Sequence, residues 1–130
     1  GISDVVLFTV SLGDAVLIVA TPEPTSLTDA YATVKVLATT QPARPMRLLV
    51  NQVQKVGEGR AVATQLQQVV DRFVVSPTGV VPKLQFLGDI PFDPSVREAV
   101  RKRQLLLELH PGSPAALGVN QVAVRLLGRA

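Results

Sequence analysis

Three short apolar runs recur along the chain, separated by segments whose apolar residues have helical spacing. The runs are rich in Val, Ile and Leu and cover residues 15–21, 47–53 and 85–91. The first two are nearly continuous rather than alternating, which is typical of strands covered on both faces, as in parallel sheets flanked by helices. The sequence therefore predicts three parallel strands joined by connections of helical length.

The segments around these runs predict helices. Apolar residues recur every three or four positions over about residues 25–38, 59–74, 94–109 and 113–127, so that each segment has one apolar side. Residues 3–12 are also expected to be helical. The predicted order is a helix followed by β, α, β, α, β, α, α. This order indicates an α/β fold, a doubly wound parallel sheet with helices on both faces.

Polar residues and prolines mark the ends of the predicted helices. Ser26, with Asp29 three residues later, resembles a capping box at the start of the first segment. Asp93 suits an N-cap and Pro94 suits the first helical position after the third run. We interpret His110, which precedes a Pro-Gly pair, as a cation at a helix C-terminus rather than a catalytic base.

Length and composition indicate one globular unit. The chain has 130 residues, of which 47% are hydrophobic and 18% charged, so intrinsic disorder is excluded. No stretch approaches the roughly 20 apolar residues of a membrane span, and the first residues lack a basic leader with an apolar core. We therefore expect a cytoplasmic protein. Because three strands make a small sheet, we expect residues 1–130 to form a single partial domain that lacks the first half of its sheet.

The charged residues and the lack of metal-binding residues limit which ligands and partners the chain can bind. With no cysteine and one histidine, the chain has no thiolate ligands for zinc or iron–sulfur clusters. Basic residues exceed acidic ones by 13 to 10, and the excess gathers at Arg97, Arg101, Lys102 and Arg103, opposed only by Glu98. This small surplus favours a solvated helix face over a surface for an anionic partner. Only 4% of the residues are aromatic, so we expect no nucleic-acid partner.

Candidate ligand-binding residues follow the predicted strands. In doubly wound sheets, ligands bind beyond the carboxyl ends of the strands. The segment 22–26, the pair Asn51 and Gln52, and the segment 89–93 all fall on that edge, although loop caps and turns explain them equally well. No G-x-x-x-x-G-K-[ST] motif is found in the sequence. Gly57 and Gly59 are interpreted as a loop and a helix start.

Several motifs carry a family resemblance. Residues 20–37, ATPEPTSLTDAYATVKVL, closely resemble a segment of the MinD/ParA-type ATPases, above all of the flagellar-number regulators called FlhG, FleN or YlxH. Residues 1–3 resemble the end of the D-T-G-A-G-I-S switch motif. Residues 49–51 resemble the strand that ends in an adenine-reading asparagine, and residues 88–93 resemble the G-x-I-P-x-D loop beside the base. The resemblance implies the C-terminal half of a MinD-like P-loop NTPase fold.

The resemblance also implies a function for the complete protein. ATP, with Mg²⁺, would drive dimerisation and binding to a partner or to a membrane surface, and hydrolysis to ADP would reset the cycle. The output would be control of flagellar number and position. The implied partners are a second copy and flagellar assembly or transcription proteins. The implied location is the cytoplasm, with peripheral binding at the inner membrane face.

Site residues are carried over motif by motif. The resemblance assigns the nucleotide-base pocket to Asn51, Pro91 and Asp93. Candidates for the switch or dimer face are Gly1, Pro22, Glu23, Pro24, Thr25, Ser26 and Asp29. No catalytic residue or metal ligand is assigned, because no segment of the chain matches the family's phosphate-binding loop or switch aspartates. Since phosphoryl transfer depends on those groups, we expect the chain alone to hydrolyse no ATP and to need no cofactor.

Two alternatives remain open at this stage. One is a nucleotide-independent protein-interaction module, and the other is a division-site-selecting MinD. Among related families, iron–sulfur carriers and the nitrogenase iron protein need cysteines that the chain lacks. The DNA-partition branch would usually show a more basic surface.

Overall fold

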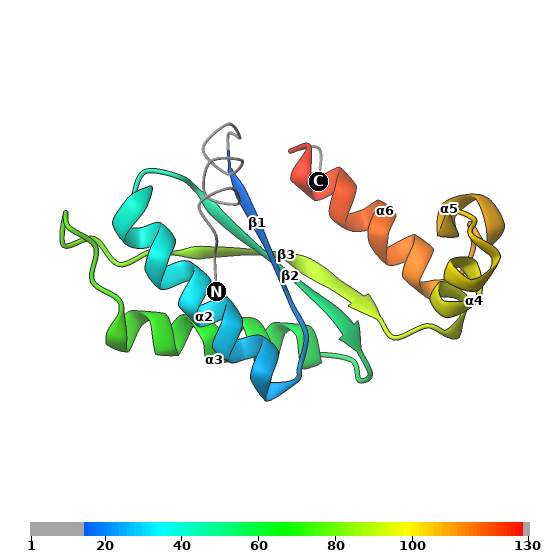
Figure 1. The fold of residues 1–130 in the computed structure, drawn as a ribbon, viewed down its shortest axis with the longest axis horizontal. Coiled ribbons are helices and arrows are strands. Elements are labelled where there is room, and N and C mark those ends of the chain that lie inside the picture. Colours follow the sequence, from blue (N-terminus) through cyan, green and yellow to red (C-terminus); the bar gives the residue numbers. More distant parts are fainter. Residues whose placement is uncertain (1–14, 129–130) are drawn as a thin grey trace.

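A computed structural model describes residues 15–128, and these form one parallel sheet flanked by helices (Figure 1). The strands are β1 (Val16–Ala20), β2 (Met46–Val53) and β3 (Leu84–Pro91), in the spatial order β1-β2-β3. Both pairings are parallel. The predicted α/β fold and all three predicted strands are therefore confirmed, whereas the helix expected at residues 3–12 lies outside the described residues.

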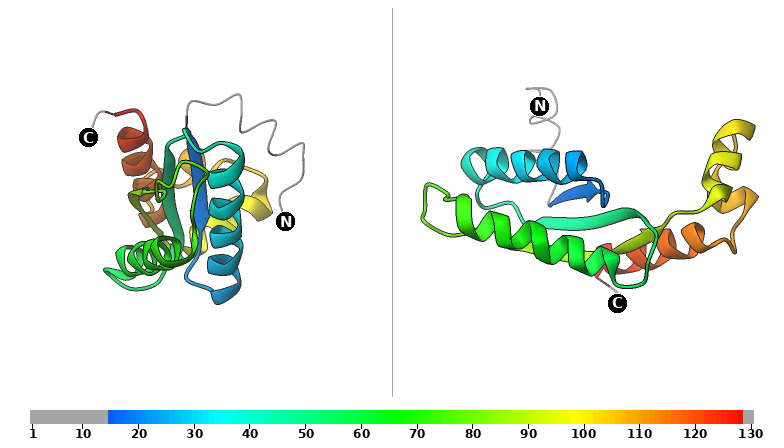
Figure 2. Two further views of the ribbon diagram at one scale, coloured as in Figure 1. Left: turned by 90° about the vertical axis from the view of Figure 1, so that its left-hand side faces the viewer. Right: turned by 90° about the horizontal axis from the view of Figure 1, so that it is seen from below.

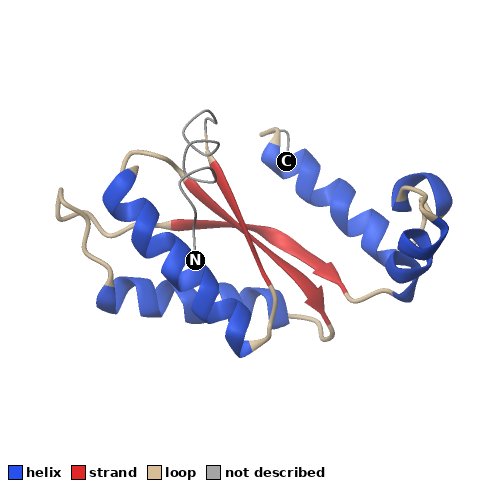
Figure 3. Ribbon diagram, viewed as in Figure 1, coloured by secondary structure: helices blue, strands red, loops and turns tan. Residues whose placement is uncertain are grey.

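Helices connect and follow the strands, as Figure 3 shows by colour. They are α2 (Pro24–Thr40), α3 (Glu58–Phe73), α4 (Pro94–Lys102), α5 (Leu106–Leu109) and α6 (Pro114–Leu126). Helices α2 and α3 each link two successive strands, which is the crossover that a parallel pair requires. After β3, helices α4 and α5 extend away from α2 and α3, toward the far end of the molecule (Figure 2).

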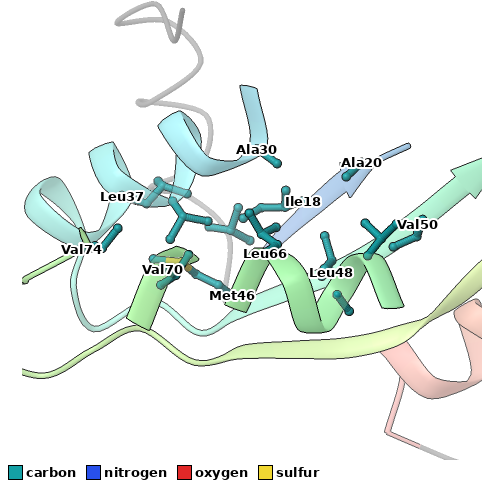
Figure 4. Packing of buried hydrophobic residues seen from close by; sticks show 14 of the residues in the cluster. Ile18, Ala20, Ala30, Leu37, Met46, Leu48, Val50, Leu66, Val70 and Val74 are labelled. Carbon is teal, nitrogen blue, oxygen red and sulfur yellow. The ribbon is translucent and has the colours of Figure 1, made fainter. Parts of the chain in front are cut away.

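The main hydrophobic core lies between the sheet and helices α2 and α3. Fully buried Leu37 and Val70 from these helices belong to the same cluster as Leu48 and Val50 from the central strand (Figure 4). Full burial of such a side chain contributes about 1.5 to 3 kcal/mol. The even-numbered residues of β1, and those of β2 up to Val50, supply this face, as expected from the two-residue period of a strand. After the irregularity beyond Val50, it is Val53 that joins the core.

Helix α6 covers part of the opposite face of the sheet. Val122 packs there against Leu49 and Leu87. The backbones approach closely at Gly118, where an added Cβ would lie 3.3 Å from the ring of Pro91. Arg125 Nη1 donates a hydrogen bond of 2.6 Å to the carbonyl of Leu87, in the middle of β3. These contacts hold α6 against β3.

Strand β1 is only partly covered. Its odd-numbered residues Leu17 and Val19 are exposed on the α6 side of the sheet. Within residues 15–128, β1 pairs with β2 alone, so its other edge has no neighbouring strand. In the described part of the chain, the sheet thus ends at β1 with an apolar face and an unpaired backbone edge.

One predicted helix is interrupted in the structure. The expected helix over residues 94–109 is two helices, because α4 ends where Arg103 adopts a left-handed conformation with φ of 53°. The amide of Arg103 donates to the carbonyl of Val100 (3.1 Å) and that of Gln104 to the carbonyl of Ala99 (3.0 Å). This is a Schellman ending, which usually has glycine at the left-handed position. The prediction was wrong because no glycine marks the break.

The start of α2 also differs from its prediction. The helix begins at Pro24, its N-cap is Glu23 without a side-chain cap, and Ser26 lies inside the first turn. The hydroxyl of Ser26 instead accepts a hydrogen bond of 2.8 Å from the amide of Thr21. The expected capping box of Ser26 and Asp29 is therefore wrong, whereas the predicted cap at Asp93 is confirmed.

Candidate functional site

Two adjoining hollows lie near the carboxyl end of β1. The larger, of about 700 Å³, follows β1 and the facing side of α2. The smaller, of about 330 Å³, lies between residues 22–24 and the segment after β2. Glu23 and Gln52 line both hollows, so the two form one concave region beside the free edge of the sheet.

The loop from β1 to α2 forms one wall of this region. The bond from the Thr21 amide to Ser26 Oγ closes the loop onto the first turn of α2. The amide of Glu23 donates to the hydroxyl of Thr21 at 3.3 Å, which holds Glu23 at the junction of the two hollows. The conformation of this wall is thus fixed by the two loop hydrogen bonds and by the proline at the first position of α2.

The predicted switch or dimer-face residues fall on this wall, apart from Gly1, which lies outside the described residues. Those that line the larger hollow are Glu23, Thr25, Ser26 and Asp29. Those that line the smaller one are Pro22, Glu23 and Pro24.

The end of β2 forms the opposite wall. Gln52 has φ of 58°, a left-handed backbone that is uncommon for a residue other than glycine. The register of β2 against β3 shifts between Val50 and Val53, so the strand is irregular where Asn51 and Gln52 lie. Asn51 Oδ1 accepts a hydrogen bond of 2.8 Å from the amide of Gln52. This bond fixes the direction of the Asn51 carboxamide, and the turn places Gln52 against the hollows.

Asp93 has a clear structural role after β3. Its Oδ1 accepts a hydrogen bond of 2.9 Å from the amide of Ser95, and its Oδ2 accepts one of 3.0 Å from the amide of Ala115. The hydrogen bond from the amide of Ala115 has the largest effect, and with the bond from Ser95 it holds the pKa of Asp93 below its ordinary value. One buried carboxylate therefore caps α4 and also binds the first turn of α6.

The three predicted nucleotide residues lie at neighbouring strand ends. Val53 pairs with Pro91, and the amide of Phe92 donates to the carbonyl of Val53 at 2.8 Å. Asn51 and Asp93 thus lie at the same edge of the β2–β3 pair. Their hydrogen bonds join them to Gln52, Ser95 and Ala115 rather than to one another.

Sequence reasoning missed two residues of the smaller hollow. Gln54 and Glu58 line it, and Glu58 Oε1 accepts a hydrogen bond of 2.8 Å from the amide of Gln54. An acidic residue at the first position of a helix, five residues after a strand end, is the only signal that could have identified them. Nearby, a Cβ on Gly59 would overlap the carboxylate of Asp89, so α3 starts close against β3.

The hollows combine apolar residues of β1 and α2 with polar residues, and all of their charged residues are acidic. Glu23, Asp29 and Glu58 line them, and no lysine or arginine does so among the residues that the structure describes. Phosphate groups, which need cationic or amide donors, are therefore poorly matched to these walls. Residues 15–128 also hold no group of His, Cys, Asp and Glu side chains that could bind a metal ion. No helix in this part of the chain is long and apolar enough to cross a membrane.

Comparison with known proteins identifies relatives along nearly the whole chain. No family model matches. The antiactivator FleN of Pseudomonas aeruginosa is 39% identical over 126 residues, which are 97% of this chain and 43% of FleN. The flagellum site-determining protein YlxH of Helicobacter pylori is 30% identical over 116 residues, 89% of this chain and 37% of YlxH. The chain thus spans less than half of the length of these relatives.

Solved structures agree with this assignment. The cell division protein MinD of Aquifex aeolicus matches with a TM-score of 0.72 and 25% identity, over all of this chain and 50% of MinD. The MinC:MinD complex from the same organism matches with a TM-score of 0.74 and 21% identity, which shows the fold. The resemblance inferred from the motifs is confirmed. The chain belongs with FleN and YlxH among the MinD-like proteins and is a homologue of one part of them.

Proposed function

We propose that this chain is the C-terminal half of a MinD-like ATPase of the FleN and YlxH type. In complete form, the protein binds and hydrolyses ATP to control flagellar number and position. The 39% identity to FleN over 97% of the chain carries the proposal. A division-site MinD is less favoured, because the identity to MinD is 25% over the whole of this chain.

The free edge of β1 supports the assignment to half of a larger sheet. Among the described strands, β1 has a neighbour on one side only, and the MinD chain of the same fold is about twice as long. The proposal assigns the strands that pair with this edge, and the groups that hold phosphate and Mg²⁺, to the rest of the polypeptide. The charged residues that line the hollows are acidic, which supports placing the phosphate-binding groups outside these walls.

Within this chain, the proposal gives the nucleotide base to Asn51, Pro91 and Asp93. Because Asn51 Oδ1 accepts the amide of Gln52, its Nδ2 group is left to donate to an acceptor nitrogen of adenine. Pro91 offers a flat apolar contact. Asp93 takes part by holding the loop after β3 through its bonds to Ser95 and Ala115.

The β1–α2 loop is the proposed dimer face. The hydrogen bond between Thr21 and Ser26 holds this loop in one conformation at the rim of the hollows. In the complete protein it would meet a second copy when ATP is bound. Flagellar assembly or transcription proteins are the proposed further partners, and the inner membrane face is the proposed site of peripheral binding.

The decisive experiment uses the complete protein encoded by the gene. Asn51→Ala should weaken ATP binding by about 1 to 3 kcal/mol in calorimetry, the usual effect of leaving a buried partner unpaired. Asn120→Ala, at an exposed position of α6, is the matched control and should bind ATP normally. In a strain that lacks the gene, the Asn51 variant should fail to restore the normal number of flagella.

Two results would refute the proposal. If the deletion strain has the normal number of flagella, the proposed role in flagellar number is wrong. A complete protein that controls flagellar number but binds no ATP would instead identify a nucleotide-independent interaction module.

A further inference from the structure

The segment after β3 presents apolar side chains to solvent. Of the nine residues of α4, only Ala99 is buried. Phe92, Val96 and Val100 expose 55%, 40% and 70% of their surfaces. Leu105 and Leu107, just beyond the helix, are exposed as well. Figure 2 shows that α4 and α5 extend away from the layer formed by α2 and α3.

The apolar residues form a row along α4. Val96 and Val100 are four positions apart, so they lie one above the other on the same side of the helix. Arg97 and Arg101 form the adjacent row, and both are exposed. We call these two rows, Val96 and Val100 beside Arg97 and Arg101, the α4 surface.

The cations of the α4 surface lack acidic partners. The carboxylate of Glu98 is bound at 2.9 Å by Lys102 and at 2.9 Å by His110. The hydrogen bond from Lys102 has the larger effect, and with that from His110 it holds the pKa of Glu98 below its ordinary value. Within residues 15–128, neither Arg97 nor Arg101 forms an ion pair. The row of arginines therefore keeps its positive charge beside an uncovered apolar row.

This charge pattern selects among possible occupants. A second copy bound through the same surface would place the arginine rows against each other, and like charges disfavour that contact. Nucleic acid would use the arginines but leave the valines without a role, because phosphate contacts need donors. A lipid surface would gain little, since α4 is short and offers two valines to the acyl region.

We propose that the α4 surface docks an amphipathic helix of a partner protein whose apolar stripe is bordered by carboxylates. Val96 and Val100 pack against the stripe, in the manner of helix-on-helix recognition with anchors one turn apart. Arg97 and Arg101 bind the carboxylates along its border. The sequence suggested only a solvated basic face. The exposure of the adjacent valines changes that interpretation.

The test uses the complete protein encoded by the gene, without nucleotide, so its outcome does not depend on the proposed ATP binding and hydrolysis. The probe is a designed helical peptide of about 20 residues with leucines on one face and glutamates along both borders. A peptide of the same composition in scrambled order is the comparison. Binding is measured by fluorescence anisotropy, and its position by amide chemical shifts.

Two double variants examine the two rows. Val96→Ser with Val100→Ser should weaken peptide binding at least about tenfold at every salt concentration, because the anchors are lost. Arg97→Gln with Arg101→Gln should weaken binding at low salt and reduce its salt dependence. The matched controls, Val75→Ser with Val80→Ser and Lys35→Gln with Lys55→Gln, change exposed residues elsewhere and should bind as the wild type does.

Four outcomes would overturn the proposal. The first is equal binding of the scrambled peptide, and the second is binding that is insensitive to the valine variant. The third is shift changes outside residues 92–109. The fourth is tighter binding to vesicles of phosphatidylglycerol and phosphatidylcholine, or to duplex DNA, than to the peptide.

Discussion

The carboxylate of Asp93 joins two helix starts that are distant in sequence. Its bonds to the amides of Ser95 and Ala115 lower its pKa in the folded protein. A lowered folded pKa means that the ionised group stabilises the fold at neutral pH. That contribution is lost as the pH falls through the unfolded pKa, about 3.9, and then the folded one.

We therefore expect Asp93→Asn to lower the urea midpoint at pH 7. The variant should also lose less stability than the wild type between about pH 5 and pH 3, because it has no carboxylate to protonate at this site. Urea titrations at several pH values, followed by circular dichroism, measure both effects. Parallel pH profiles for the two proteins would contradict the role given to Asp93.

Gly59 is a second residue whose replacement has a defined effect. In an exposed helix, glycine to alanine usually stabilises by about 0.5 to 1 kcal/mol. At Gly59 the added Cβ meets the side chain of Asp89, including its Cβ, so Gly59→Ala should instead destabilise by about 1 to 3 kcal/mol. Gly112→Ala is the control, since no atom lies within 4 Å of its added Cβ. Equal midpoints for the two variants would refute the close approach.

At the scale of elements, the break after α4 depends on the left-handed Arg103. Glycine adopts this conformation without the penalty that a Cβ carries, so Arg103→Gly should stabilise the chain by about 0.5 to 1 kcal/mol. The same change at Arg101, inside α4, should destabilise it by about 1 kcal/mol. Thermal unfolding of the two variants gives opposite shifts if the break persists in solution. Destabilisation by both would indicate one continuous helix.

The elements that could be predicted from sequence are those with a strong hydrophobic pattern. The strand around Val50 is buried on both faces and the helix around Leu66 along one side, so their apolar patterns are visible in the sequence. The break at Arg103 and the start of α2 at Pro24 depend on backbone conformations that several residue types can adopt. Local preference was therefore insufficient at these two positions.

The candidate site was predictable only in part, for a related reason. Because parallel strands end at one edge, strand ends placed Asn51 and Asp93 at that edge without any structure. The position of Gln54 and Glu58 depends on the turn that Gln52 makes, with φ of 58°. No sequence pattern specifies that turn, so the smaller hollow could not be anticipated.

At the scale of the whole molecule, the edge of β1 that pairs with no strand among residues 15–128 should control association. Its free backbone groups and the exposed Leu17 and Val19 offer a template for pairing between chains. We expect the isolated chain to form dimers or higher oligomers at about 100 μM, a concentration at which exposed edges associate. Light scattering measures the mass.

Val19→Lys should shift this equilibrium toward monomers, because a charge on an edge strand opposes pairing. Val75→Lys, at an exposed position away from the sheet, should leave the mass distribution unchanged. A monodisperse wild-type monomer would contradict the expectation.

The parallel register of the sheet also has a consequence for folding kinetics. Val16 pairs with Met46, and Met46 pairs in turn with Leu84, so each pair of strands must close a loop that contains a whole helix. Neither of these two strand pairs can form as a local hairpin, so the chain loses the entropy of both loop closures before most of the stabilising contacts form. The chain should therefore fold more slowly than a helical bundle of its length, and β2, which both closures share, should be the last strand to exchange its amide hydrogens.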